Sequence, residues 1–169
     1  MGNKEQKSSP IAWIIIGLIT VAVVFLIFKS SNAPERPPKT NREVAMICTT
    51  DMATQFHIHP YLQIIVNGQP KEIPAEVGIS NSCMNPLHTH DNTGKIHVES
   101  PERRDFTLAD FFAVWKKTFT KDQILDYKVD ETHTIRQTIN GVETKDYENT
   151  ILHDGNQIII YYEEIKQLP

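Results

Sequence analysis

The chain has 169 residues, two cysteines and a formal net charge of −4, which leaves room for one modest domain and not for two large ones. Its charge is uneven: residues 1–42 carry six Lys or Arg and two acidic residues, whereas residues 43–169 carry 11 and 19. An acidic soluble part repels polyphosphates, so this composition excludes nucleic acid as a partner and suits a protein that attracts cations.

An uninterrupted apolar run at 11–28 (IAWIIIGLITVAVVFLIF) follows the polar N-terminus. It contains no charge, Asn, Gln or Pro, and it would form about 27 Å of helix, close to the bilayer core of about 30 Å. A cleaved signal peptide is the alternative, since 31–33 (SNA) resembles a cleavage site, but such a peptide has an apolar core of only about 7–15 residues. We therefore predict a short tail at 1–10 and an uncleaved transmembrane anchor at 11–28, which makes the membrane a partner.

Residues 29–42 (KSSNAPERPPKTNR) are rich in Pro, Ser and Asn and predict an extended tether before a domain at 43–169. A simple count of the Lys and Arg residues that flank the apolar run would place this domain inside the cell. Two considerations outweigh the count. A whole domain crosses a membrane largely regardless of charge, and the two cysteines suit a disulfide, which forms in oxidising compartments. The domain is expected on the extracytoplasmic side.

Strand patterns dominate this domain. The pattern at 56–66 ends at Asn67-Gly68, and the pattern at 134–139 ends at Asn140-Gly141. Asn-Gly between β-formers is the strongest short signal of a hairpin, because both central residues of the favoured turn have positive φ. The terminal strand at 157–163 is a continuous apolar run, which predicts burial on both of its faces.

The helical signals are fewer. Thr107 and Asp110 form a variant capping box before apolar residues at i, i+3, i+4 and i+7, which predicts an amphipathic helix at 108–115. A second, short helix is predicted from Thr120 through Leu125. The expected fold class is α+β: a small strand-dominated domain with Asn-Gly hairpins and one main helix packed on the sheet.

Five of the seven histidines lie in three groups: His57-Ile58-His59, His88-Thr89-His90 and His97. Side chains two apart on a strand point to the same face, about 6.5–7 Å from each other. If 91–94 is a four-residue loop joining strands at 87–90 and 95–99, His88 lies directly opposite His97. The face that these two share would then also carry His90, Lys95 and Glu99.

Three imidazoles and a carboxylate on one face are a ligand set for Zn, Cu, Ni or Fe. We predict that a copper or zinc ion is held by some of the five clustered histidines, which are His57, His59, His88, His90 and His97. A Cys48–Cys83 disulfide would draw the two His-X-His pairs together and contribute about 3–4 kcal/mol through loop-closure entropy. The nearby Met46, Met52 and Met84 favour copper slightly, although methionine more often fills a core.

The histidines also have a metal-free interpretation. They can hydrogen-bond to Asp91 or to the backbone and brace the turn, as in an accessory or assembly subunit of a membrane complex. A third possibility is a metal-dependent enzyme with Glu99 as the general base beside a bound water. No second carboxylate and no nucleophile motif accompanies Glu99, so a non-enzymatic role is favoured. His133 and His153 are isolated and are expected to be structural.

Motifs between Cys48 and Trp115 are similar to those of a known family. They are HIHPYLQIIVNG (57–68), IPAEVGI (73–79), CMNPLHTHD (83–91), GKIHVESP (94–101) and FTLADFFAVW (106–115). In these motifs the chain resembles an uncharacterised family of membrane-anchored or secreted bacterial and archaeal proteins. The resemblance implies an extracytoplasmic setting and a shared core of His and Cys, and it implies no reaction. Ala109 and Lys116 stand where the family often has glycine.

Overall fold

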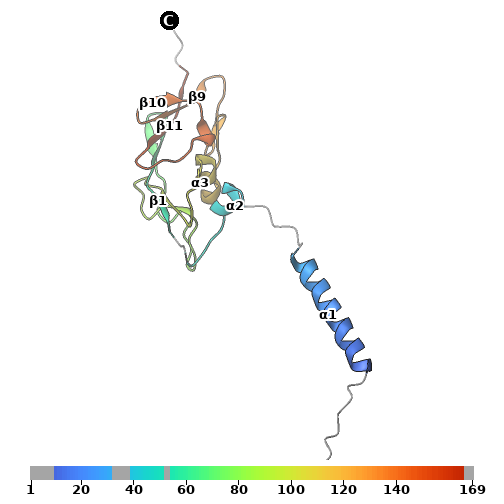
Figure 1. The fold of residues 1–169 in the computed structure, drawn as a ribbon. Coiled ribbons are helices and arrows are strands. Elements are labelled where there is room, and N and C mark those ends of the chain that lie inside the picture. Colours follow the sequence, from blue (N-terminus) through green and yellow to red (C-terminus); the bar gives the residue numbers. More distant parts are fainter. Residues whose placement is uncertain (1–9, 32–38, 52–53, 166–169) are drawn as a thin grey trace, which may run out of the picture. The chain divides into compact units, whose positions relative to one another are not determined.

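A computed structural model describes residues 10–31, 39–51 and 54–165 (Figure 1). Its internal contacts divide the chain into two compact units, residues 1–38 and residues 39–169. Residues 1–9 of the predicted tail at 1–10 and residues 32–38 of the predicted tether at 29–42 lie outside the described residues.

The apolar run forms the helix α1, Pro10–Ser31. The large apolar side chains described between Ile11 and Leu26 are 47% to 69% exposed, so they form no core within their own unit. Within the described residues, no helix meets the combined length and hydropathy needed to cross a bilayer. The helix itself is confirmed, and its role as an anchor stays a prediction.

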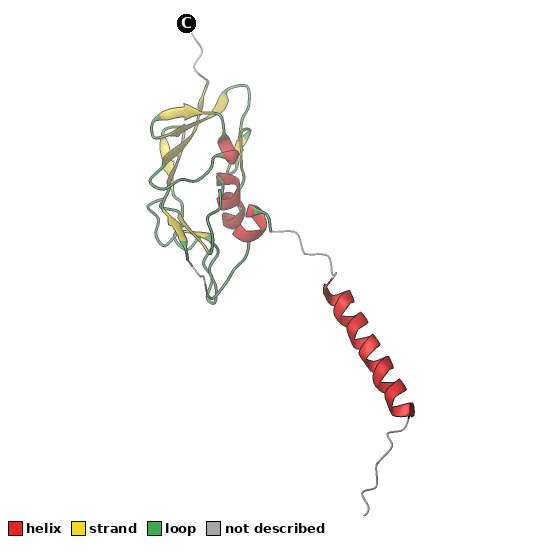
Figure 2. Ribbon diagram, in the orientation of Figure 1, coloured by secondary structure: helices red, strands yellow, loops and turns green. Residues whose placement is uncertain are grey.

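The second unit is a strand-rich α+β domain with three sheets (Figure 2). The first sheet has the order β1-β5-β4 and is antiparallel: β1 Phe56–Ile58, β5 His97–Ser100 and β4 Leu87–His88. The largest sheet has the order β10-β9-β11-β2-β3: β10 Val142–Thr144, β9 His133–Ile139, β11 Gln157–Glu164, β2 Tyr61–Val66 and β3 Gln69–Lys71. The third is the meander β6 Phe119–Thr120, β7 Gln123–Ile124 and β8 Tyr127–Lys128. The helices are α2 Asn41–Ala45, α3 Leu108–Trp115 and the 3₁₀ helix η1 Tyr147–Asn149.

Both predicted Asn-Gly hairpins are confirmed. Asn67 and Gly68 have φ of 50° and 77°, and Asn140 and Gly141 have φ of 52° and 81°. The residues that flank each turn pair directly, so each loop contains only the Asn and the Gly. These are the positive φ values that the two-residue turn requires.

The terminal strand differs from its prediction. β11 is the central strand of the largest sheet, parallel to β2 and antiparallel to β9. Ile158, Ile160 and Tyr162 are buried, whereas Ile159 and Tyr161 are only half-buried. One face of the strand therefore belongs to the core and the other is partly open, although the run is apolar throughout.

The prediction of a short helix from Thr120 through Leu125 is wrong, because this segment belongs to the meander β6-β7-β8. The Thr120 hydroxyl accepts a hydrogen bond from the Asp122 N–H at 3.2 Å, and Thr120 pairs with Gln123 across a two-residue turn. Leu125 has φ of 53°, outside the helical region, at the second turn. The polar pattern that resembled a helix cap is a turn signal.

Helix α3 begins as predicted and supports the first sheet. The Thr107 N–H and hydroxyl both donate to the Asp110 carboxylate, at 3.0 and 3.1 Å, and Arg42 of α2 contacts its other oxygen at 2.8 Å. Phe111 and Phe112 are buried. α3 packs against β4 and against α2, so the helix lies behind the strand that carries His88.

Helix α3 ends at Lys116, whose backbone conformation suits glycine better than lysine. Lys116 has φ of 60° and ψ of 36°, a left-handed conformation that glycine adopts without steric cost. Lys116→Gly should raise the free energy of unfolding by about 0.5–1 kcal/mol. Glycine removes the steric cost of the left-handed conformation, and this gain exceeds the loss from the larger conformational entropy of the unfolded chain. Urea denaturation measures this, with Lys117→Gly, whose φ is not positive, as the matched control. Equal destabilisation by both variants would contradict the assignment.

Candidate metal centre

The first sheet brings the predicted histidines together. Its central strand β5 carries His97, which pairs with His88 of β4 as the sequence predicts. On its other edge β5 pairs with β1, which places His57 opposite Glu99. Since Glu99 lies two residues from His97, all four side chains stand on the same face of the sheet.

The hairpin between β4 and β5 is wider than predicted, because pairing stops at His88 and His97. The backbone groups beyond that pair are hydrogen-bonded elsewhere: Ile96 N–H donates to the Pro60 carbonyl at 2.9 Å, and Leu62 N–H to the Gly94 carbonyl at 2.8 Å. Gly94 has φ of 82°, and any Cβ there would collide with the Leu62 carbonyl. The loop is thus held against the start of β2, and the predicted pairing of 89–90 with 95–96 does not form.

Thr89 fixes the direction of its two histidine neighbours. It is fully buried; its hydroxyl donates to the Pro74 carbonyl at 2.8 Å and accepts from the Val77 N–H at 3.1 Å. Neighbouring side chains of an extended chain point to opposite sides. His88 and His90 are therefore both directed away from the Pro74–Val77 segment and toward the face that carries His97.

His59 is held by a turn from the far end of the chain. Its N–H donates to the Asp154 carboxylate at 2.8 Å, and its carbonyl accepts from the Gly155 N–H at 3.2 Å. Sequence reasoning missed this support, because nothing in the DG pair at 154–155 points to a residue 95 positions away.

Two groups of three histidines result, and each can hold a metal ion. His57, His59 and His97 form one, and His88, His90 and His97 form the other; within each, the potential ligand atoms lie within 4.8 Å of one another. The shortest distances are 3.2 Å between His88 Nε2 and His90 Nε2, and 3.5 Å between His57 Nε2 and His97 Nδ1. All five predicted ligands thus belong to one connected cluster.

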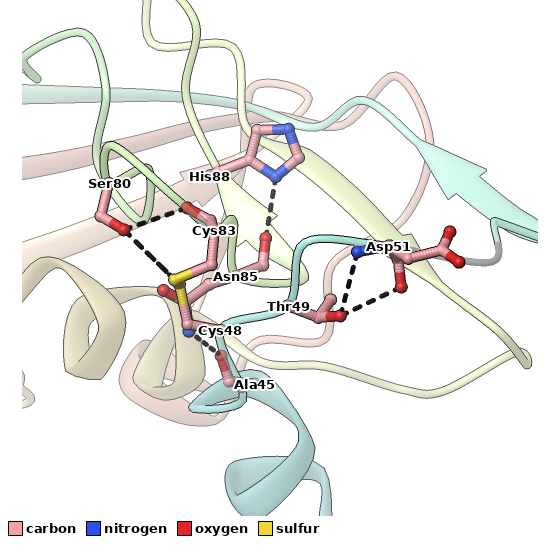
Figure 3. Close-up of a disulfide and its surroundings, with 8 residues drawn as sticks. All are labelled: Ala45, Cys48, Thr49, Asp51, Ser80, Cys83, Asn85 and His88. Atoms are coloured by element: carbon pink, nitrogen blue, oxygen red, sulfur yellow. Dashed lines mark hydrogen bonds between the residues drawn. A yellow bond between two sulfur atoms is a disulfide. The ribbon is translucent and has the colours of Figure 1, made fainter.

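The tautomer of His88 is set by the main chain. His88 Nδ1 lies 3.0 Å from the Asn85 carbonyl, which can only accept, so Nδ1 carries the proton and Nε2 keeps a free lone pair (Figure 3). A carbonyl bonded to the far nitrogen is the usual outer support of a metal-binding histidine. Asn85 was not predicted, because a backbone carbonyl leaves no sequence signal.

Glu99 belongs to the His57 side of the cluster. Its Oε1 lies 3.1 Å from His57 Nε2 and 4.0 Å from His97 Nδ1. Lys95, predicted on the same face, extends instead over the ring of Tyr61, 5.8 Å from its centroid. The carboxylate can therefore serve as a further ligand or a hydrogen-bond acceptor, and no ammonium neutralises it by direct contact among the described residues.

The cluster favours neutral imidazoles. Burial, followed by the neighbouring His59, His88 and His90, lowers the pKa of His97 from 6.5 to about 4, against the opposing charge of Glu99. Burial is also the first cause that lowers the pKa of His88 and of His59. Metal binding requires the unprotonated ring, so these nitrogens are available at neutral pH without displacing a proton.

The two histidines outside the cluster have surroundings of their own. His133 stacks on Tyr162 and contacts Asp130, and His153 is exposed. Met46 is 47% exposed, and Met52 lies outside the described residues. Neither isolated histidine belongs to a candidate metal group among the described residues.

The Cys48–Cys83 disulfide is confirmed, with a Cα–Cα distance of 5.3 Å. Beside it, Thr49 and Met84 exchange two backbone hydrogen bonds of 3.0 and 2.9 Å. This link ties the segment after α2 to the segment that enters β4 (Figure 3). The disulfide thus anchors the segment that leads into the strand of His88. It also suggests an extracytoplasmic domain, because disulfides form in oxidising compartments.

Comparison with family models, curated proteins and solved structures finds no match for this chain. The family resemblance of its motifs therefore stays a prediction, and the function has to be argued from the geometry of the cluster.

The disulfide should contribute substantially to stability. It closes a loop over a separation of 35 residues, for which loop-closure entropy gives about 4 kcal/mol. The double variant Cys48→Ser/Cys83→Ser should lower the free energy of unfolding by about that amount in urea denaturation. Ser82→Ala, an exposed neighbour, is the control. A loss below about 1 kcal/mol would contradict a stabilising role.

The metal-free chain should lose stability in mild acid. His97 binds its proton less readily when folded, so unfolding takes up a proton between pH 6.5 and about 4. The stabilisation is present above pH 6.5 and disappears as the pH falls toward 4, on the order of 2–3 kcal/mol. Urea denaturation of the EDTA-treated chain should show this slope, with His97→Gln flattening it and His153→Gln leaving it unchanged. An equal slope in both variants would refute this origin.

Proposed function

We propose that this chain is a membrane-anchored extracytoplasmic protein that binds copper or zinc through its histidine cluster, in metal handling or in stabilising a partner's site at the membrane. The ligands are His57, His59, His88, His90 and His97. One observation carries the proposal. Five imidazoles from separate parts of the chain form two groups of three that share His97, and within each group the potential ligand atoms lie within 4.8 Å of one another.

The distances fit a shared ion. Two imidazole nitrogens bound to one tetrahedral ion at about 2.0 Å lie about 3.3 Å apart. The measured nitrogen pairs, His88 with His90 at 3.2 Å and His57 with His97 at 3.5 Å, are close to that value. An ion would therefore require little movement of these four rings.

The donor set and the charge agree with a borderline metal. Imidazole suits zinc and copper, whereas magnesium and calcium prefer oxygen ligands. The Asn85 carbonyl presets His88 for coordination, and Glu99 adds a negative charge beside the rings. Residues 43–169 carry an acidic excess that attracts cations to the domain.

The cellular setting rests on the sequence and the disulfide together. The uncharged run at 11–28 supports an anchor, and the Cys48–Cys83 disulfide supports an oxidising compartment. The motif resemblance to anchored or secreted proteins agrees with both. We propose a single-pass orientation with the domain outside the cytoplasm.

A metal-free accessory subunit of a membrane complex is the second candidate, and the same short distances favour it. His88 and His90 can share a proton over their 3.2 Å separation, and His57 can donate to Glu99 over 3.1 Å. Such a network would satisfy the rings without an ion. The two candidates differ in what chelation does to the protein.

Metal loading separates them. The full chain, purified in detergent, stripped with EDTA and titrated with Zn²⁺ or Cu²⁺, should bind at least one equivalent, counted by elemental analysis after gel filtration. At 100 times the dissociation constant the metal should stabilise the fold by about 2.7 kcal/mol. His90→Ala removes an exposed ligand and should weaken binding at least about 10-fold.

His153→Ala, which removes an exposed histidine outside the cluster, is the matched control and should bind like the unaltered chain. If the melting temperature is the same with metal and with chelator, and the metal content stays well below one equivalent, the metal proposal is refuted. Co-purification with other membrane subunits would then favour the accessory role.

A further inference from the structure

The histidine cluster has two lobes that meet at one residue. His97 belongs to both candidate groups, and its ring contacts each of the other four at centroid distances from 4.6 to 5.7 Å. Among the described residues, no ring contact and no candidate group joins His57 or His59 to His88 or His90. The cluster is thus two pairs on either side of a central ring.

This arrangement follows from the sheet order. β5 lies between β1 and β4, so the pair from the β1 end and the pair from the β4 end approach His97 from opposite edges. An ion bound by His57 and His59 belongs to a candidate group that does not contain His88 or His90. No candidate group among the described residues contains more than three of the five rings, and the two groups share only His97.

Imidazole chemistry decides how both groups can be filled at once. Each ring nitrogen has a single in-plane lone pair for a metal, so one nitrogen binds one ion. His97 Nδ1 faces the β1 side, 3.5 Å from His57 Nε2 and 4.0 Å from Glu99 Oε1. Its Nε2, on the other side of the ring, is the atom left for an ion at the β4 side.

We propose that the cluster is a dinuclear centre in which the ring of His97 bridges two copper or zinc ions. This rests on the proposed function and specifies it. His57 and His59 hold one ion together with Nδ1 of His97, and His88 and His90 hold the other together with Nε2. Binding the second ion releases the remaining ring proton of His97 to water, which leaves a bridging imidazolate.

Glu99 and solvent complete the coordination. The Glu99 carboxylate lies beside the first group, 3.1 Å from His57 Nε2, and can be a fourth ligand there. His57, with 42% of its side chain exposed, and His90, also exposed, open their groups to water. The second group has three rings and is exposed at His90, so its ion keeps a fourth position for a small external ligand.

Stoichiometry tests the second site. The full chain, EDTA-stripped and titrated with Cu²⁺, should bind two equivalents. His57→Ala and His90→Ala remove one exposed ligand from opposite groups, so each should lower the tightly bound copper to one equivalent, while His153→Ala keeps two. Exposed positions are chosen because buried His88 could not be removed without risk to folding. Circular dichroism checks that each variant is folded.

Electron paramagnetic resonance tests the bridge. Two Cu²⁺ ions joined by an imidazolate couple their spins, so the fully loaded chain should lose most of its signal, whereas the His57→Ala and His90→Ala variants, with one Cu²⁺, should give a full signal. Two equivalents with an undiminished signal would overturn the bridge. One equivalent in the unaltered chain would overturn the dinuclear centre and leave the proposed function standing. If the chain binds neither copper nor zinc in the same titration, both the dinuclear centre and the proposed function are overturned.

Discussion

The central position of β5 is the constraint on which the candidate metal centre depends. A strand inside a sheet has a neighbour on each edge, so His97 meets imidazoles from both sides. The two registers place His57 opposite Glu99 and His88 opposite His97. Because side chains alternate along a strand, a slip of one residue in either pairing would turn one set of rings to the other face. The cluster therefore exists only as long as both registers hold.

Contacts that do not involve the rings support the segments that carry them. Buried Thr89 binds the Pro74–Val77 segment, Asp154 holds the backbone of His59, and the disulfide ties the chain that enters β4. Gathering the imidazoles has an energetic cost, because burial is the first cause that lowers the pKa of His59, His88 and His97, and neighbouring rings lower it further. A domain with its own apolar core, including buried Phe106 and Phe111, can offset that cost. Such concentrated desolvation is typical of a functional site.

The parts of this site that depend on local chemistry could be predicted from the sequence. The spacing of His88 and His97 around a turn gave their pairing, and the two cysteines gave the only possible intrachain disulfide. The pairing of β1 with β5 could not be predicted, because His57 and Glu99 are joined only by non-local packing. The same holds for Asp154. At 119–128 a turn signal resembled a helix cap, and the segment pairs with itself as a meander of three short strands.

X-ray absorption at the metal edge tests most directly whether the histidines are ligands. The full chain loaded with Zn²⁺ or Cu²⁺ should show a first shell of nitrogen at about 2.0 Å, with the multiple scattering of several imidazole rings. A first shell made only of oxygen, unchanged when His90 is replaced by alanine, would contradict coordination by the cluster.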